Sequence, residues 1–77
     1  MIKFYGMSDD IKNRISGRVR QLRIKHGYTQ EKLAELAGIE YKHIQRVESK
    51  TPCDLKASTL EKLAKAFKIS VSELMKL

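Results

Sequence analysis

The sequence contains few residues that interrupt helices or form cross-links. Its 77 residues include one proline, four glycines and one cysteine. With so few turn-forming residues the chain has little capacity for β-hairpins and is expected to be helical. The single Cys53 has no partner for an internal disulfide, which suits a reducing compartment. One cysteine and two scattered histidines also make a poor zinc site, so no metal is expected.

Long apolar runs and catalytic motifs are missing as well. No segment approaches the roughly 20 apolar residues that a membrane span needs. The opening residues MIKFYG are too short for the apolar core of a signal peptide, so we expect a cytoplasmic protein with no membrane partner. Nothing in the spacing places His26 or His43 beside Cys53 as a base. The sequence therefore predicts no catalytic residue, no cofactor and no enzyme activity.

Acidic residues are the minority charge. Nine Asp and Glu oppose sixteen Lys and Arg, which gives a net charge of +7 at pH 7. A field of this sign attracts polyanions, whether nucleic acid or an anionic membrane surface. A surface that is charged only for solubility is the alternative. The chain is long enough for one domain with a modest core and leaves little room for a deep catalytic pocket.

Apolar residues recur at spacings of three and four, which is typical of helices with one buried face. The first helix is expected to begin at Ser8 or Asp9 and to end at Gly27. The core-facing positions of five short helices are Ile11, Ile15, Val19 and Leu22; Leu33, Ala34 and Ala37; Ile44 and Val47; Leu60, Leu63, Ala64 and Phe67; and Val71, Leu74 and Met75.

The second and third predicted helices meet at a tight turn. Thr29 caps the second helix, and Ala34 lets the two helices approach closely. Gly38 can adopt positive φ and turn the chain sharply, and the side chain of Ile39 is expected to fill the inside of the turn. The third helix runs from residue 40 or 41 to 49. These are the physical requirements of a helix-turn-helix, whose second helix lies in the major groove.

Pro52 marks residues 50–57 as a loop. Capping boxes at 58–61 and 70–73 then predict the starts of the fourth and fifth helices. Residues 1–8 are expected to form an arm that touches DNA, contacts a second subunit or stays disordered, and residues 9–77 the domain.

Several segments in this order resemble the phage repressor and Cro-type helix-turn-helix family. The segments are RQLR at 20–23, GYTQEKLA at 27–34, AGI at 37–39, Ile44, VE at 47–48 and TLEKLAKAFKIS at 59–70. The resemblance covers about residues 14–75. It implies a compact, all-α, five-helix lambda-repressor-like domain that regulates transcription by binding double-stranded DNA.

The resemblance also implies roles for individual residues. The residues expected to reach base edges are Tyr41, Lys42, Gln45 and Arg46, with phosphate contact or solvation as the alternative. The residues expected near phosphates are Thr29, Gln30, His43, Ser49 and Lys50, with Lys56 in the loop as a further candidate. An ion pair between Arg23 and Glu48 is expected to tie the first helix to the end of the third.

The third helix departs from the family pattern at both ends. Glu40 stands where a better capping residue is usual, so the start of the helix is poorly capped. Lys50 stands where a glycine often ends the helix.

One short helix reads too few base pairs for a whole genome, so a homodimer on a palindromic site is expected. The apolar residues assigned to the dimer interface are Phe67, Leu74, Met75 and Leu77, unless all of them belong to the core. With no second domain, no small-molecule effector is expected. An antitoxin that also binds its own operator is the alternative function, followed by a domain that binds only other proteins.

Overall fold

In residues 8–50, 52 and 55–77, which the computed structural model describes, the regular secondary structure is entirely helical. The helices of this part are α1 (Asp9–Lys25), α2 (Gln30–Ala37), α3 (Tyr41–Val47), α4 (Ala57–Ala66) and α5 (Val71–Leu74). The predicted all-α fold class is therefore confirmed. The arm predicted at residues 1–8, except for Ser8, and Cys53 lie outside the described residues.

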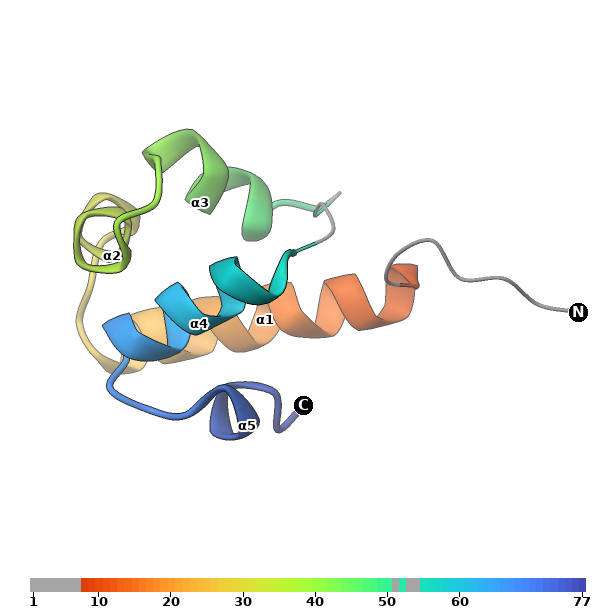
Figure 1. Cartoon of the computed structure of the whole chain (residues 1–77). Helices are drawn as coiled ribbons and strands as arrows, with labels where there is room; N and C mark the ends of the chain where they lie inside the picture. Colours follow the sequence, from red (N-terminus) through yellow and green to blue (C-terminus); the bar gives the residue numbers. More distant parts are fainter. Residues whose placement is uncertain (1–7, 51, 53–54) are drawn as a thin grey trace, which may run out of the picture.

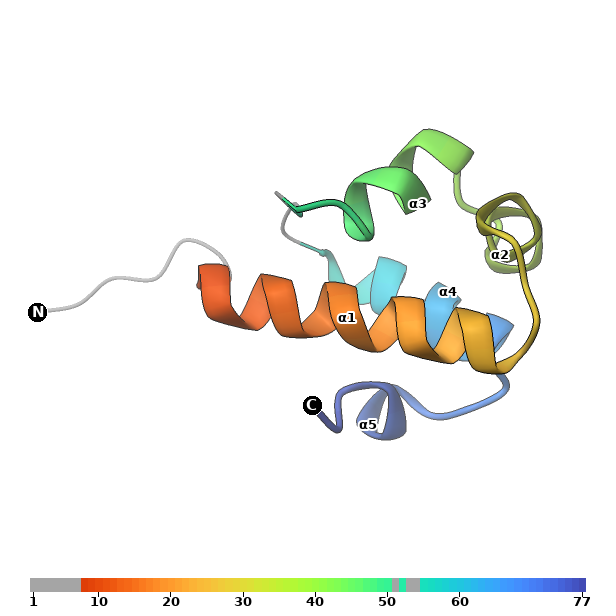
Figure 2. The same ribbon diagram turned by 180° about the vertical axis from the view of Figure 1, so that it is seen from behind.

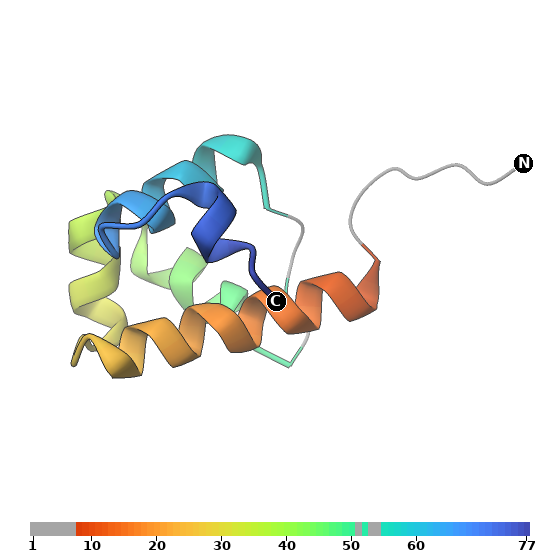
Figure 3. The ribbon, with the colours of Figure 1, turned by 90° about the horizontal axis from the view of Figure 1, so that it is seen from below.

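The longest helix, α1, supports the others. In Figure 1, α4 runs beside α1, α3 lies above them, and α2 lies at one end, where it packs against α3 and α4. Seen from behind, α3 and α5 lie on opposite sides of α1 (Figure 2). Seen from below, α5 lies over the space between α1 and α4 (Figure 3). One side of α3 is thereby left without a covering helix.

All five described helices contribute to one apolar core. Most predicted core positions are buried, whereas Ile11, Val71 and Met75 are only partly covered. Leu55, in the segment before α4, joins the core although the sequence pattern placed it in a loop. Burying apolar side chains from every helix supplies the main driving force for a chain of this size.

Short-range capping interactions set three helix starts. The hydroxyl of Ser8 accepts from the N–H of Ile11, that of Thr29 from Lys32, and that of Ser70 from Glu73. Each bond satisfies a backbone donor that the first turn of a helix leaves free. The caps predicted for α1, α2 and α5 are therefore confirmed.

The prediction of a capping box at Ser58 is wrong. Helix α4 begins one residue earlier, at Ala57, and its N-cap residue Lys56 makes no side-chain cap hydrogen bond. Thr59 and Leu60 are both buried, and their N–H groups already bond to the carbonyl of Lys56. Tertiary packing of these two residues thus starts the helix before the serine.

Replacing Gly17 by alanine is expected to stabilise the protein. Gly17 lies in the middle of α1 on its exposed side, and a Cβ built there has no heavy atom within 4 Å. Because alanine has the higher helix propensity, we expect the free energy of unfolding to rise by about 1 kcal/mol in urea titrations. The same change at Gly38, where φ is +67°, should lower it. An equal response at the two glycines would contradict this expectation.

Candidate nucleic-acid interface

Helices α2 and α3 are joined by the sharp turn that the sequence predicts. Gly38 adopts φ 67° and ψ 36°, the left-handed conformation that favours glycine. The N–H of Ile39 bonds to the carbonyl of Ala34 at 3.0 Å, and Ile39 packs against the core. Ala34 and Ala37 are buried, so α2 approaches its neighbours closely. The turn therefore holds the two helices in a fixed relation.

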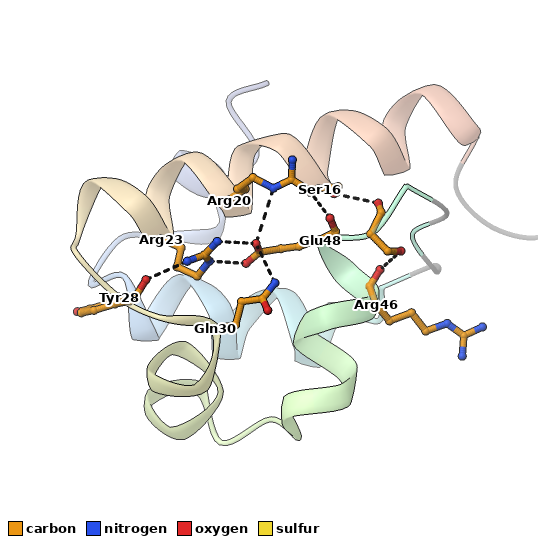
Figure 4. A network of polar contacts seen from close by, with 8 residues as sticks. Ser16, Arg20, Arg23, Tyr28, Gln30, Arg46 and Glu48 are labelled. Carbon is orange, nitrogen blue, oxygen red and sulfur yellow. Dashed lines mark hydrogen bonds and ion pairs between the residues drawn. The ribbon is translucent and has the colours of Figure 1, made fainter.

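Helix α3 is anchored on one side and open on the other. Ile44 and Val47 are 0% and 2% exposed, and they attach the helix to the core. The four residues assigned to base edges are all exposed, and they are Tyr41, Lys42, Gln45 and Arg46. In Figure 4 the side chain of Arg46 extends away from the protein. The outward face required for groove binding is thus present in this chain.

The N-terminal end of α3 is weakly capped, and His43 lies to one side of it. Glu40 occupies the N-cap and makes no side-chain cap hydrogen bond, as expected for a residue that caps poorly. His43 is half-buried and borders a hollow between the turn and α4, which Thr59 and Lys62 also line. His43 therefore lies on the side of α3 that faces α4, apart from the four exposed residues.

A buried carboxylate ties the site together (Figure 4). The side chain of Glu48, just after α3, is 2% exposed. Arg23 of α1 donates from Nε to Oε2 at 2.8 Å and from Nη2 to Oε1 at 3.0 Å, so the expected ion pair is present in two-point geometry. Gln30, the first residue of α2, donates from Nε2 to Oε1 at 3.3 Å. A buried charge is tolerated only with such partners.

Sequence reasoning missed two further α1 residues that contact the same region. Arg20 lies with its Nε 3.8 Å from Oε1 of Glu48, and its Nη2 donates to the main-chain carbonyl of Glu48. Ser16 donates to the carbonyl of Ser49 at 3.5 Å. The spacing of Ser16, Arg20 and Arg23 places them on one face of a helix, which is the signal that was available.

Four of the five residues assigned to phosphates lie at the ends of helices, and His43 lies within α3. Thr29 and Gln30 are at the N-terminus of α2, where the Thr29 hydroxyl is an exposed cap. Ser49 and Lys50 follow α3; the Ser49 hydroxyl donates to the carbonyl of Arg46 at 2.7 Å, and Lys50 is exposed. Lys56 is also exposed, at the start of α4.

Two of the residues assigned to a dimer interface were assigned wrongly. Phe67 and Leu74 are each 1% exposed within the single chain, so they have almost no surface to offer a partner. Phe67 packs against the rings of His26 and Tyr28, with centroids 5.3 and 6.3 Å away. Both residues belong to the apolar core of the single chain. Met75 is half-buried and Leu77 is 38% exposed.

The described residues hold neither a metal-binding cluster nor a membrane span. No group of three or more His, Cys, Asp or Glu residues among them is placed to bind a metal ion. None of their helices combines the length and the apolar character needed to cross a bilayer.

Comparison with known proteins agrees with this geometry. A model of the helix-turn-helix family matches residues 19–74, which span α2, the turn and α3. The chain belongs to the helix-turn-helix family. This helix-turn-helix chain gives no significant match among curated protein sequences.

Solved structures of regulators share the fold. The restriction-modification controller protein C.AhdI from Aeromonas hydrophila is 31% identical, with a TM-score of 0.78 over 87% of this chain and 98% of that one. SinR, a master regulator for biofilm formation solved in complex with DNA, is 29% identical, with a TM-score of 0.74 over 80% of this chain and 98% of that one. A hypothetical transcription factor from Neisseria, at 24% identity and a TM-score of 0.78 over 97% of this chain and 84% of that one, shows the same fold.

Proposed function

We propose that the protein is a sequence-specific transcription regulator that binds double-stranded DNA as a homodimer on palindromic sites. The observation that carries this proposal is the polar, exposed face of α3 on a helix that Ile44, Val47 and Glu48 fix to the core. The net charge of +7 favours a polyanionic partner. The likeness to a controller protein and to a regulator solved with DNA supports this function over the antitoxin alternative.

The base-reading face has suitable chemistry. Arg46 and Lys42 carry donors for O6 and N7 of guanine, and Gln45 can both donate to and accept from an adenine edge. Tyr41, 42% exposed at the start of α3, offers an aromatic surface for a thymine methyl group and a hydroxyl for a phosphate. These four side chains would determine which sequence is bound.

Contacts to the DNA backbone would set the register. Gln30 is the first residue of α2, and the first N–H groups of a helix, which have no partner within the helix, are a common site for anions. The Nε2 of Gln30 bonds to Glu48, which orients the amide at that position. Lys50 lies beyond the other end of the base-reading helix. Thr29, Gln30, His43, Ser49 and Lys50 remain our assignment for phosphate contacts.

Dimerisation would double the length of DNA that is read. One α3 contacts only a few base pairs, and each good contact contributes about 1–3 kcal/mol of discrimination. Two copies would place their α3 helices in half-sites about 34 Å apart. Met75 and Leu77 are the interface residues from our assignment that retain exposed surface, and they lie at or just beyond the end of α5. A cytoplasmic location, with access to DNA, is part of this proposal.

Selection of binding sites from random duplex DNA tests the proposal directly. We expect an enriched palindrome with half-sites about one helical turn apart, and protection of both half-sites in a footprint. Analytical ultracentrifugation of the complex should give two protein chains for each duplex. Selection at low salt that enriches no sequence would contradict the proposed function.

Replacing Arg46 by alanine is expected to relax the sequence preference. The exposed guanidinium would no longer bond a guanine edge, so repeated selection should lose its preference at one position of each half-site, by a factor of about ten. Gln30→Ala is the comparison, and it should weaken binding to all duplexes alike because phosphates carry no sequence information. An unchanged selection profile for Arg46→Ala would remove this residue from the base-reading set.

A further inference from the structure

Among the described residues, helix α3 ends differently from α1, α2 and α4. After α1, α2 and α4 the chain passes through a residue with positive φ, respectively Gly27, Gly38 and Lys68. Such residues turn the chain so that backbone N–H groups bond the last carbonyls of the helix. The C-cap of α3 is Glu48, with φ −92° and ψ 4°, and no described residue just after it has positive φ.

At this end of α3 the backbone N–H of Ser49 bonds to the carbonyl of Arg46 at 3.2 Å, and side chains supply further bonds to the carbonyls. The Ser49 hydroxyl donates to the carbonyl of Arg46 at 2.7 Å. From α1, Arg20 donates to the carbonyl of Glu48, and the buried Ser16 donates to the carbonyl of Ser49 at 3.5 Å. Ser16 and Arg20 are one helical turn apart, so a single face of α1 holds the end of α3.

Arg20 holds both the main chain and the side chain of Glu48. Its Nη2 bonds to the carbonyl, and its Nε lies 3.8 Å from the carboxylate. A cation at this end also complements the negative pole of the helix. The carboxylate does not depend on Arg20, because Arg23, 17% exposed, bonds both of its oxygens. The contact specific to Arg20 is therefore the one to the backbone at the end of α3.

We propose that Arg20 is a positioning residue that fixes the C-terminal end of α3, and thereby the direction in which its base-reading face points. This inference rests on the proposed function. Helix α3 has seven residues, so a loose end changes the placement of Gln45 and Arg46, which lie in its last turn. Base contacts depend on this placement far more than phosphate contacts do, because they require defined edges and angles.

The test compares Arg20→Ala with Lys65→Ala. Both replacements remove one positive charge from an exposed position, but Lys65 lies in the last turn of α4, away from the end of α3. Dissociation constants are measured on the duplex selected by the unaltered protein and on a mixed-sequence duplex, over a range of salt concentrations. Hydrogen exchange of the amides at 47–49 is measured without DNA.

For Arg20→Ala we expect the ratio of the two dissociation constants to fall by about tenfold. The salt dependence should match that of Lys65→Ala, and amide exchange at 47–49 should accelerate. Lys65→Ala should leave the ratio and the exchange unchanged. Arg20→Lys keeps the positive charge but lacks the planar guanidinium with its several donors. It should therefore restore only part of the ratio between the two dissociation constants. Ser16→Ala should shift both readouts in the same direction as Arg20→Ala.

Two results would overturn the inference. An unchanged ratio in Arg20→Ala would show that Arg20 does not position the base-reading face. Equal weakening on both duplexes, with a salt slope reduced by about one, would make Arg20 a phosphate ligand instead. If the unaltered protein does not discriminate between the duplexes, the proposed function fails, and amide exchange alone decides whether Arg20 holds the end of α3. Thermal melting checks that each variant is folded, and Arg20→Lys replaces Arg20→Ala if the latter is not.

Discussion

Replacing Glu48 by alanine is expected to lower the free energy of unfolding by about 3 kcal/mol, as measured by urea titration. The carboxylate is 2% exposed and accepts hydrogen bonds from Arg23 of α1 and Gln30 of α2. Its loss leaves the guanidinium of Arg23, itself only 17% exposed, without its charge partner. Since Glu48 directly follows α3, we also expect weaker binding to every duplex.

Glu35→Ala is the matched control for Glu48→Ala. Glu35 also has a basic partner, Lys32 at 3.8 Å, but its side chain is 73% exposed. Exposed pairs contribute little, so the free energy of unfolding should change by less than about 0.5 kcal/mol. Glu48→Gln keeps an acceptor for one hydrogen bond and should fall between the two alanine variants. Similar losses for Glu35→Ala and Glu48→Ala would show that the buried network does not stabilise the fold.

The affinity for DNA is expected to fall by about a thousandfold between 50 and 200 mM salt. Each Lys or Arg that neutralises a phosphate releases a condensed counterion, and the chain carries a net charge of +7. The dissociation constant on the selected duplex, measured by fluorescence anisotropy at several KCl concentrations, should give a steep linear relation between the two logarithms. An almost flat relation would contradict the assignment of the phosphate-contacting residues.

Lys50→Ala tests one of those contacts separately. Lys50 is exposed just beyond α3, so its loss should reduce the salt slope by about one for each protein chain bound. Lys65→Ala, in the last turn of α4, removes the same charge at an exposed position away from α3 and should change the slope less. A slope that is equal in both variants would remove Lys50 from the interface.

Much of the framework follows from local sequence. Ser8, Thr29 and Ser70 each cap the helix that begins with the next residue, because a capping bond spans only three residues. Gly27 and Gly38 end helices because they adopt positive φ without strain. The apolar spacing also separates the buried face of α3 from its exposed one. The existence of the turn and the outward face of α3 are thus readable from the residues themselves.

Local patterns were insufficient where several segments compete for the same core. Ser58 has the sequence of a capping residue, but the burial of Thr59 and Leu60 starts α4 before it. Phe67 and Leu74 look the same in sequence whether they face the core or a partner. Only tertiary packing decides: Phe67 packs against the rings of His26 and Tyr28, and Leu74 is buried on α5, which lies over α1 and α4.

The sequence by itself therefore determined the helices, the glycine turn and the polar face of α3, because these depend on residues three or four positions apart. The tertiary structure decided how that face is held. Arg20 meets Glu48 across 28 positions and Ser16 meets Ser49 across 33, and no short pattern encodes such pairs. They form only when packing brings α1 against the end of α3, which is why these two contacts, unlike the ion pair between Arg23 and Glu48, became visible only in the folded chain.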